Sequence, residues 1–65
     1  MQTFNIEVWF VYTAHGELEK DYQIHKIDTN TVQEAINIAF NKYDNLRRRP
    51  IGIYHDSIKY SPDKT

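Results

Sequence analysis

The residue types that could carry catalysis or hold a metal occur in this chain, but not at the spacings that such chemistry requires. His55, Asp56 and Ser57 are the types of a nucleophilic triad, yet consecutive residues do not align a nucleophile, a base and an orienting group. His15 and His25 have no paired spacing, and the absence of cysteine excludes a cysteine-based zinc site. We therefore expect no catalytic residue, no metal, no cofactor and no enzymatic activity.

Three acidic residues, Glu17, Glu19 and Asp21, alternate along one segment. Alternation places their carboxylates on one face of an extended strand, where they could contact a hard cation. Charged residues are also typical of a solvated edge strand, where they discourage pairing with other chains, and we favour that interpretation. The two glycines, Gly16 and Gly52, are too few for a phosphate-binding loop.

A basic cluster, Arg47, Arg48 and Arg49, could contact phosphates and release their counterions. The same residues follow a predicted helix, where cations complement the helix dipole, and we favour this structural role. The alternative is a nucleic-acid-binding accessory domain, in which Lys42 and Lys59 add to the positive charge.

The strongest candidate for a contact surface involves Trp9 and Val11. Residues 3–13 alternate as a strand, and one face carries Phe4, Ile6, Val8, Phe10 and Tyr12. Trp9 and Val11 lie on the other face, which a single helix cannot cover as well. They are either covered by Tyr54 and its neighbours or form an apolar patch that binds protein; stacking of nucleic-acid bases is a further alternative. We favour protein contact, with this chain or another.

A second strand, about 17–28, follows a turn at His15 and Gly16. We expect Leu18, Tyr22 and Ile24 on its core face, with a bulge near Lys26 that returns Ile27 to that face. A helix over about 32–45 is predicted by a Thr31 cap with Glu34 as the second member of a capping box, and Asn45 is expected at its end. Its apolar face comprises Val32, Ala35, Ile36, Ala39, Phe40 and Tyr43. Residues 51–60 form either one further strand or two.

These elements predict an α+β two-layer sandwich of the form β-β-α-β(β), with a mainly antiparallel sheet of order 2-1-3 and the helix on one face. A chain of 65 residues fits one domain, which we place at 1–60, with 61–65 as a disordered tail. Nine aromatic residues favour dense packing of a small core.

Composition narrows the class of partner. The net charge of −1 does not favour nucleic acid, and no stretch approaches the roughly 18 apolar residues of a membrane span. No basic segment followed by a long apolar run opens the chain, so we expect no secretory signal and a cytoplasmic location. We expect a small non-enzymatic interaction module that self-associates, for example as a homodimer, or binds another protein through an exposed sheet face or edge.

Overall fold

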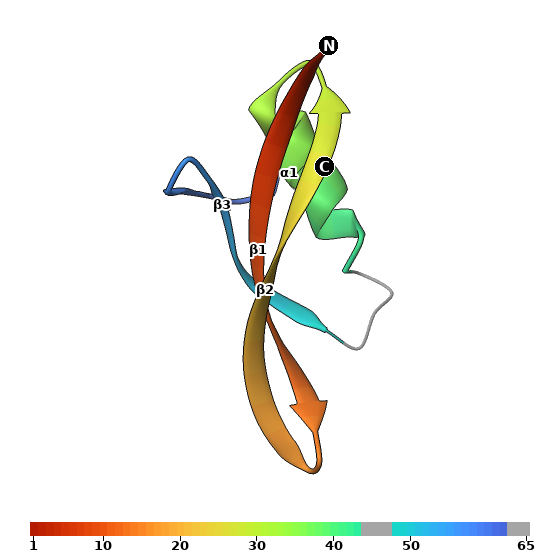
Figure 1. The fold of residues 1–65 in the computed structure, drawn as a ribbon, viewed down its shortest axis with the longest axis vertical. Coiled ribbons are helices and arrows are strands. Elements are labelled where there is room, and N and C mark those ends of the chain that lie inside the picture. Colours follow the sequence, from red (N-terminus) through yellow and green to blue (C-terminus); the bar gives the residue numbers. More distant parts are fainter. Residues whose placement is uncertain (44–47, 63–65) are drawn as a thin grey trace.

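The fold is a four-stranded antiparallel sheet with one helix on one of its faces (Figure 1). The structure is a computed structural model, and it describes residues 1–43 and 48–62. In chain order its elements are β1 (Gln2–Ala14), β2 (Glu17–Thr29), α1 (Val32–Asn41), β3 (Arg49–His55) and β4 (Ile58–Tyr60). The sheet order β2-β1-β3-β4 confirms the predicted α+β sandwich and the order 2-1-3. Residues 51–60 contribute to two strands, with Asp56 and Ser57 at positive φ in the turn between them.

The β1–β2 hairpin is long and continuous. Thirteen pairs run from Gln2 opposite Thr29 to Ala14 opposite Glu17 without a register shift. The turn holds His15 at φ 54° and Gly16 at φ 79°, and positive φ at both central positions is typical of a type I′ hairpin. Because β3 pairs with β1 only over residues 7–11, the tip of the hairpin extends beyond the third strand (Figure 1).

The expected bulge near Lys26 is wrong, and so is the expected core face of β2. Opposite residues of an antiparallel pair point to the same face, so Tyr22 lies with Trp9 and not with the core. Ile27 reaches the core opposite Phe4 without any bulge. The irregularity lies instead between β1 and β3, where Ile51 is an extra residue between the positions opposite Trp9 and Phe10.

The helix begins as expected. Thr31 is its N-cap, and the Thr31 hydroxyl accepts a hydrogen bond from the Glu34 N–H at 3.2 Å. The Glu34 carboxylate does not return to the cap amide but accepts from the hydroxyl of the buried Thr29 at 2.6 Å. This bond ties the first turn of α1 to the end of β2.

The helix ends at Asn41, earlier than the expected residue 45. The N–H of Tyr43 bonds to the Phe40 carbonyl at 3.0 Å, an i to i+3 bond that tightens the chain into a turn. The turn brings the Tyr43 ring to 5.5 Å from the Phe10 ring, between their centroids. The expected role of Asn45 lies outside the described residues.

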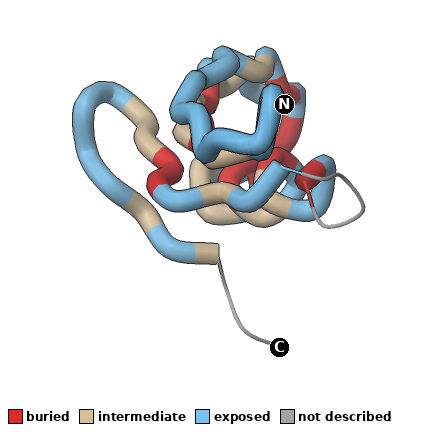
Figure 2. Tube along the Cα trace, turned by 90° about the horizontal axis from the view of Figure 1, so that it is seen from below, coloured by how far each residue is buried: buried red, intermediate tan, exposed pale blue. Residues whose placement is uncertain are grey.

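The core lies between the sheet and α1, where the buried residues gather in Figure 2. It comprises Ile6, Val8, Phe10, Ile27, Ala35, Ile36, Ala39, Tyr43 and Ile53. Of the expected tail 61–65, residues 63–65 lie outside the described part, and the Ser61 carbonyl accepts a hydrogen bond from the Gln33 amide at 3.0 Å. In the described ranges, no helix has the length and hydropathy needed to cross a membrane.

Candidate functional site

The sheet face that points away from α1, which we call the open face, is not covered by another layer formed from the described helices and strands. Strand alternation and the pairing register place on it Asn5, Glu7, Trp9 and Val11 of β1, Lys20, Tyr22, Ile24 and Lys26 of β2, and Gly52 and Tyr54 of β3. Three adjacent strands therefore build this surface.

Trp9 is the centre of the open face. Its indole stacks on the ring of Tyr22, with centroids 4.8 Å apart and planes inclined by 28°. The indole Nε1 donates a hydrogen bond to Oε2 of Glu7 at 2.6 Å. One cross-strand neighbour thus packs against the indole and a same-strand neighbour satisfies its polar atom, which fixes the orientation of a half-buried ring.

Gly52 makes room for a second aromatic ring beside Trp9. Gly52 lies opposite Trp9, and a Cβ atom added there would lie only 3.0 Å from Cε1 of Tyr54. The Tyr54 ring therefore extends along the strand over the glycine. A side chain at position 52 would displace it.

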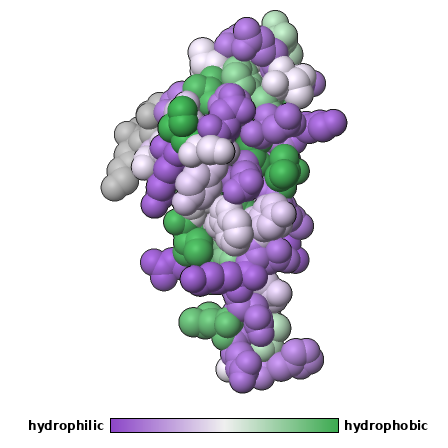
Figure 3. Space-filling model, turned by 60° about the vertical axis from the view of Figure 1, so that its left-hand side comes forward, coloured by the Kyte–Doolittle hydropathy of each residue, from purple (hydrophilic) through white to green (hydrophobic). Residues whose placement is uncertain are grey.

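Part of this surface is exposed. Tyr22 is 47% and Ile24 is 59% exposed. On the side of the molecule drawn in Figure 3, apolar residues form separate patches among hydrophilic ones, and the hairpin tip projects below the body. The open face therefore combines apolar and charged groups, as interfaces that form and dissociate do.

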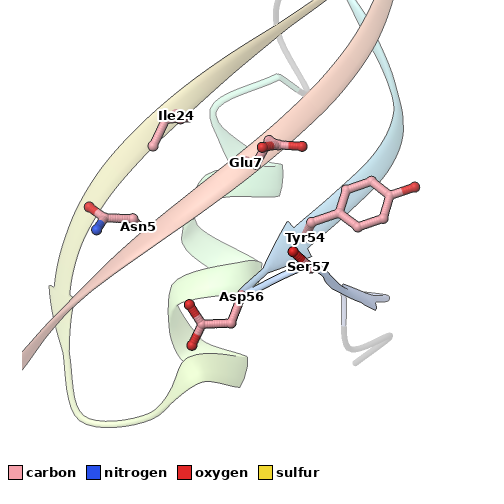
Figure 4. Close-up of a pocket in the computed structure, with 6 residues that line it drawn as sticks. All are labelled: Asn5, Glu7, Ile24, Tyr54, Asp56 and Ser57. Carbon is pink, nitrogen blue, oxygen red and sulfur yellow. The ribbon is translucent and has the colours of Figure 1, made fainter.

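An open hollow of about 470 Å³ lies between the hairpin and the β3–β4 turn (Figure 4). Its lining comprises Asn5, Glu7, Ile24, Tyr54, Asp56 and Ser57. Two of these residues are carboxylates, one already bonded to the indole. The hollow makes the open face uneven at its edge without enclosing a small molecule.

The structure brings together the three residues of the predicted protein-contact surface. Trp9 and Val11 are half-buried on the open face, and Tyr54 lies opposite Glu7 on the neighbouring strand. Sequence reasoning missed the contributions of Tyr22 and Ile24 because it assigned β2 to the wrong face, and that of Gly52 because the Tyr54 ring over it could not be foreseen.

The four predicted basic residues that the structure describes, Lys42, Arg48, Arg49 and Lys59, are spread over different parts of the fold. The Arg48 guanidinium lies over the Phe10 ring, 5.1 Å from its centroid, whereas Arg49 is paired with Val11 on the open face. Lys42 caps the C-terminus of α1, Lys59 is paired with Tyr54, and Arg47 lies outside the described residues. The last turn of α1 holds no basic residue, and the expected role of the arginines at the helix dipole stays a prediction.

A polar group connects β2 and the end of α1 on the helix side of the sheet. The Tyr43 hydroxyl donates to Oε1 of Gln23 at 3.2 Å, and its oxygen lies within hydrogen-bond distance of Nε2 of His25, at 2.6 Å. Burial, and secondly the charge of Lys42, lower the pKa of His25. Burial raises the pKa of Tyr43, against an opposing effect of Arg48. This group explains how β2 tolerates polar side chains toward the core.

The structure also places His55, Asp56 and Ser57, for which we expected no catalytic role. The His55 ring packs edge-on against Phe4 and Tyr60, and its Nε2 lies 3.7 Å from Oδ2 of Asp56. Ser57 lies in the turn at positive φ. Within residues 1–43 and 48–62, no three histidine, aspartate or glutamate side chains gather to hold a metal.

No protein-family model matches this chain, and no curated protein or solved structure matches it significantly. Inferences about function therefore depend on the geometry of the open face and its edge.

Proposed function

We propose that this protein is a small non-enzymatic interaction module that binds a protein, either a second copy of itself or another chain, through the open face and the adjoining edge of β2. The observation that carries the proposal is the Trp9–Tyr22 stack, which lies with Ile24 on a sheet face that no described layer covers. An ordered aromatic pair on a solvent-facing sheet is typical of contact surfaces, where rigid rings supply area at low entropic cost.

The small core gives a second line of support. A chain of this length buries only about 60% of the surface that its unfolded form exposes, so a partner adds substantially to its stability. The nucleic-acid alternative has less support, because its basic residues are spread over both faces: Arg48 packs on Phe10 on the helix side, and Arg49 lies on the open face.

Site-specific photo-crosslinking tests the proposal. A photoreactive phenylalanine analogue is placed at Tyr22 and, as a control, at the exposed helix residue Asn41, in cells that naturally make the protein. We expect adducts from position 22, to a second copy or to another protein, and few from position 41. Adducts at position 22 that are no more frequent than at position 41 would contradict the proposed function.

A further inference from the structure

The outer edge of β2 is long and presents unpaired backbone groups along its length. β2 has 13 residues and forms one edge of the sheet in the order β2-β1-β3-β4, whereas β4 at the other edge has three. The Tyr22 N–H donates to the Asp21 carboxylate at 2.7 Å, so it points away from β1. By alternation, the other even-numbered residues of β2 also present their backbone groups to this edge. An open edge of this length is a template for another strand.

The hairpin tip has only two strands. Pairing between β1 and β3 ends at Val11, and beyond it β1 pairs with the first residues of β2 alone among the described elements (Figure 1). Leu18 in this segment is 76% exposed. A two-stranded ribbon is marginally stable in water, and a third strand stabilises it.

We propose that the edge of β2 pairs antiparallel with the same edge of a second copy of this chain, about a two-fold axis at Ile24. The inference rests on the proposed function and names its partner. In this register Ile24 lies opposite Ile24 of the second copy, Tyr22 opposite Lys26, and Lys20 opposite Asp28. All five of these residues lie on the open face, because their partners on β1 are the odd-numbered residues from Thr3 to Val11. Two ion pairs, Lys20 with Asp28 of the second copy and the reverse, therefore flank an apolar centre.

Charge favours this register over those with the axis at Asp21, Tyr22 or Gln23. An axis at Gln23 would place Lys20 opposite Lys26, and an axis at Asp21 would oppose two carboxylates. An axis at Tyr22 would pair Lys20 with Ile24, without an opposite charge. Like charges directly opposite each other destabilise a pair of strands, and opposite charges stabilise it. The axis at Ile24 joins opposite charges and opposes none of the same sign.

An axis at Ile24 also adds a strand at the base of the hairpin tip. Eleven residues of each copy, 19–29, face each other. Glu19, which is opposite Tyr12 just beyond the end of the β1–β3 pairing, therefore lies against Thr29 of the second copy, and Lys20 lies against Asp28. The two sheets become continuous. On pairing, the Tyr22 N–H exchanges the Asp21 carboxylate for a backbone carbonyl of the second copy.

A charge-reversal cycle tests the partner and the register together. Sedimentation equilibrium is measured for the wild type, Lys20→Asp, Asp28→Lys and the double variant, with Lys59→Asp on β4 as the matched control. Each single reversal creates two like-charged pairs, so we expect the dimer dissociation constant to rise at least about tenfold. The double variant restores both ion pairs and should recover most of the affinity, and the control should leave it unchanged.

Disulfide formation gives a second measurement, because the chain has no native cysteine. Ile24→Cys places two thiols opposite each other at a Cα separation of about 5.5 Å, within disulfide range. Tyr22→Cys separates them by about 13 Å along the strand, so it should remain unlinked. A wild type that stays monomeric at millimolar concentration would overturn the inference. If position 22 still crosslinks to another protein in cells, the proposed function stands and only the second copy is wrong.

Discussion

The indole of Trp9 and the ring of Tyr22 stack across the hairpin with centroids 4.8 Å apart, and this contact defines the surface on which the functional proposal depends. The pair forms because Trp9 and Tyr22 are directly opposite in the register. The same register places Ile24 beside Glu7, the residue that binds the indole nitrogen. The stack is therefore a consequence of strand pairing. The same pairing leaves the apolar residues Tyr22 and Ile24 exposed to solvent on the outer strand.

Tyr22→Ala should destabilise the protein by about 1 kcal/mol, because it removes a cross-strand aromatic partner from a half-exposed site. Trp9 is the single tryptophan, so its fluorescence emission should also shift to longer wavelength as the indole gains water. Urea unfolding followed by this fluorescence measures both effects. Tyr22→Phe retains the ring and should behave as the wild type does; an equal loss in both variants would show that the stack contributes nothing.

Gly52→Ala should destabilise the protein by about 1–3 kcal/mol, because its methyl group would overlap the Tyr54 ring. The cost should be much smaller in a Tyr54→Ala background, where no ring lies over position 52. A thermodynamic cycle of the four proteins, measured by urea unfolding, gives the coupling free energy. A coupling near zero would contradict the described placement of the Tyr54 ring.

His25 should make stability depend on pH. Burial first, and the nearby Lys42 second, lower the pKa of His25 below its usual 6.5, so the folded state binds this proton less tightly than the unfolded state. The contribution to the free energy of unfolding is complete above the unfolded pKa and is lost as the pH falls through the folded pKa. Urea midpoints measured between neutral and mildly acidic pH should fall for the wild type and fall less for His25→Gln. Identical slopes would rule out His25 as the cause.

His15→Asn should stabilise the hairpin by a few tenths of a kcal/mol, because His15 has φ 54° and asparagine adopts positive φ more readily. The position is exposed, so no packing is lost. Thermal unfolding should show a small rise in the midpoint. His15→Val, a β-branched residue that disfavours positive φ, should lower it, and a reversed order would contradict the turn geometry.

The sequence was sufficient for the order of elements, the central place of β1, the cap at Thr31 and the apolar face of α1. It also contained an unused signal for β2. A two-residue turn at His15 and Gly16 requires opposite residues to have numbers that add to 31, which pairs Trp9 with Tyr22 directly. Residue type alone suggested the opposite orientation of β2, with Tyr22 and Ile24 toward the core, because these two are apolar whereas Gln23 and His25 are polar.

Other features depend on contacts between distant segments, which local patterns do not encode. The polar face of β2 is accepted because the Tyr43 hydroxyl, 18 and 20 residues away, bonds His25 and Gln23. The helix ends early because its last turn brings Tyr43 onto Phe10. Gly52 was visible as a glycine in a strand, but the ring that covers it was not.

Amide chemical shifts followed by NMR between micromolar and millimolar concentration test the central claim most directly. If β2 and the open face form the contact surface between copies, concentration should shift the amides of Tyr22, Ile24 and Lys26 and leave those of α1 and β4 in place. Ile58 is a matched internal reference, since it has the same exposed fraction as Ile24, 59%, at the opposite edge of the sheet. Shifts confined to β4 or α1, or no shifts at any concentration, would contradict self-association through this edge.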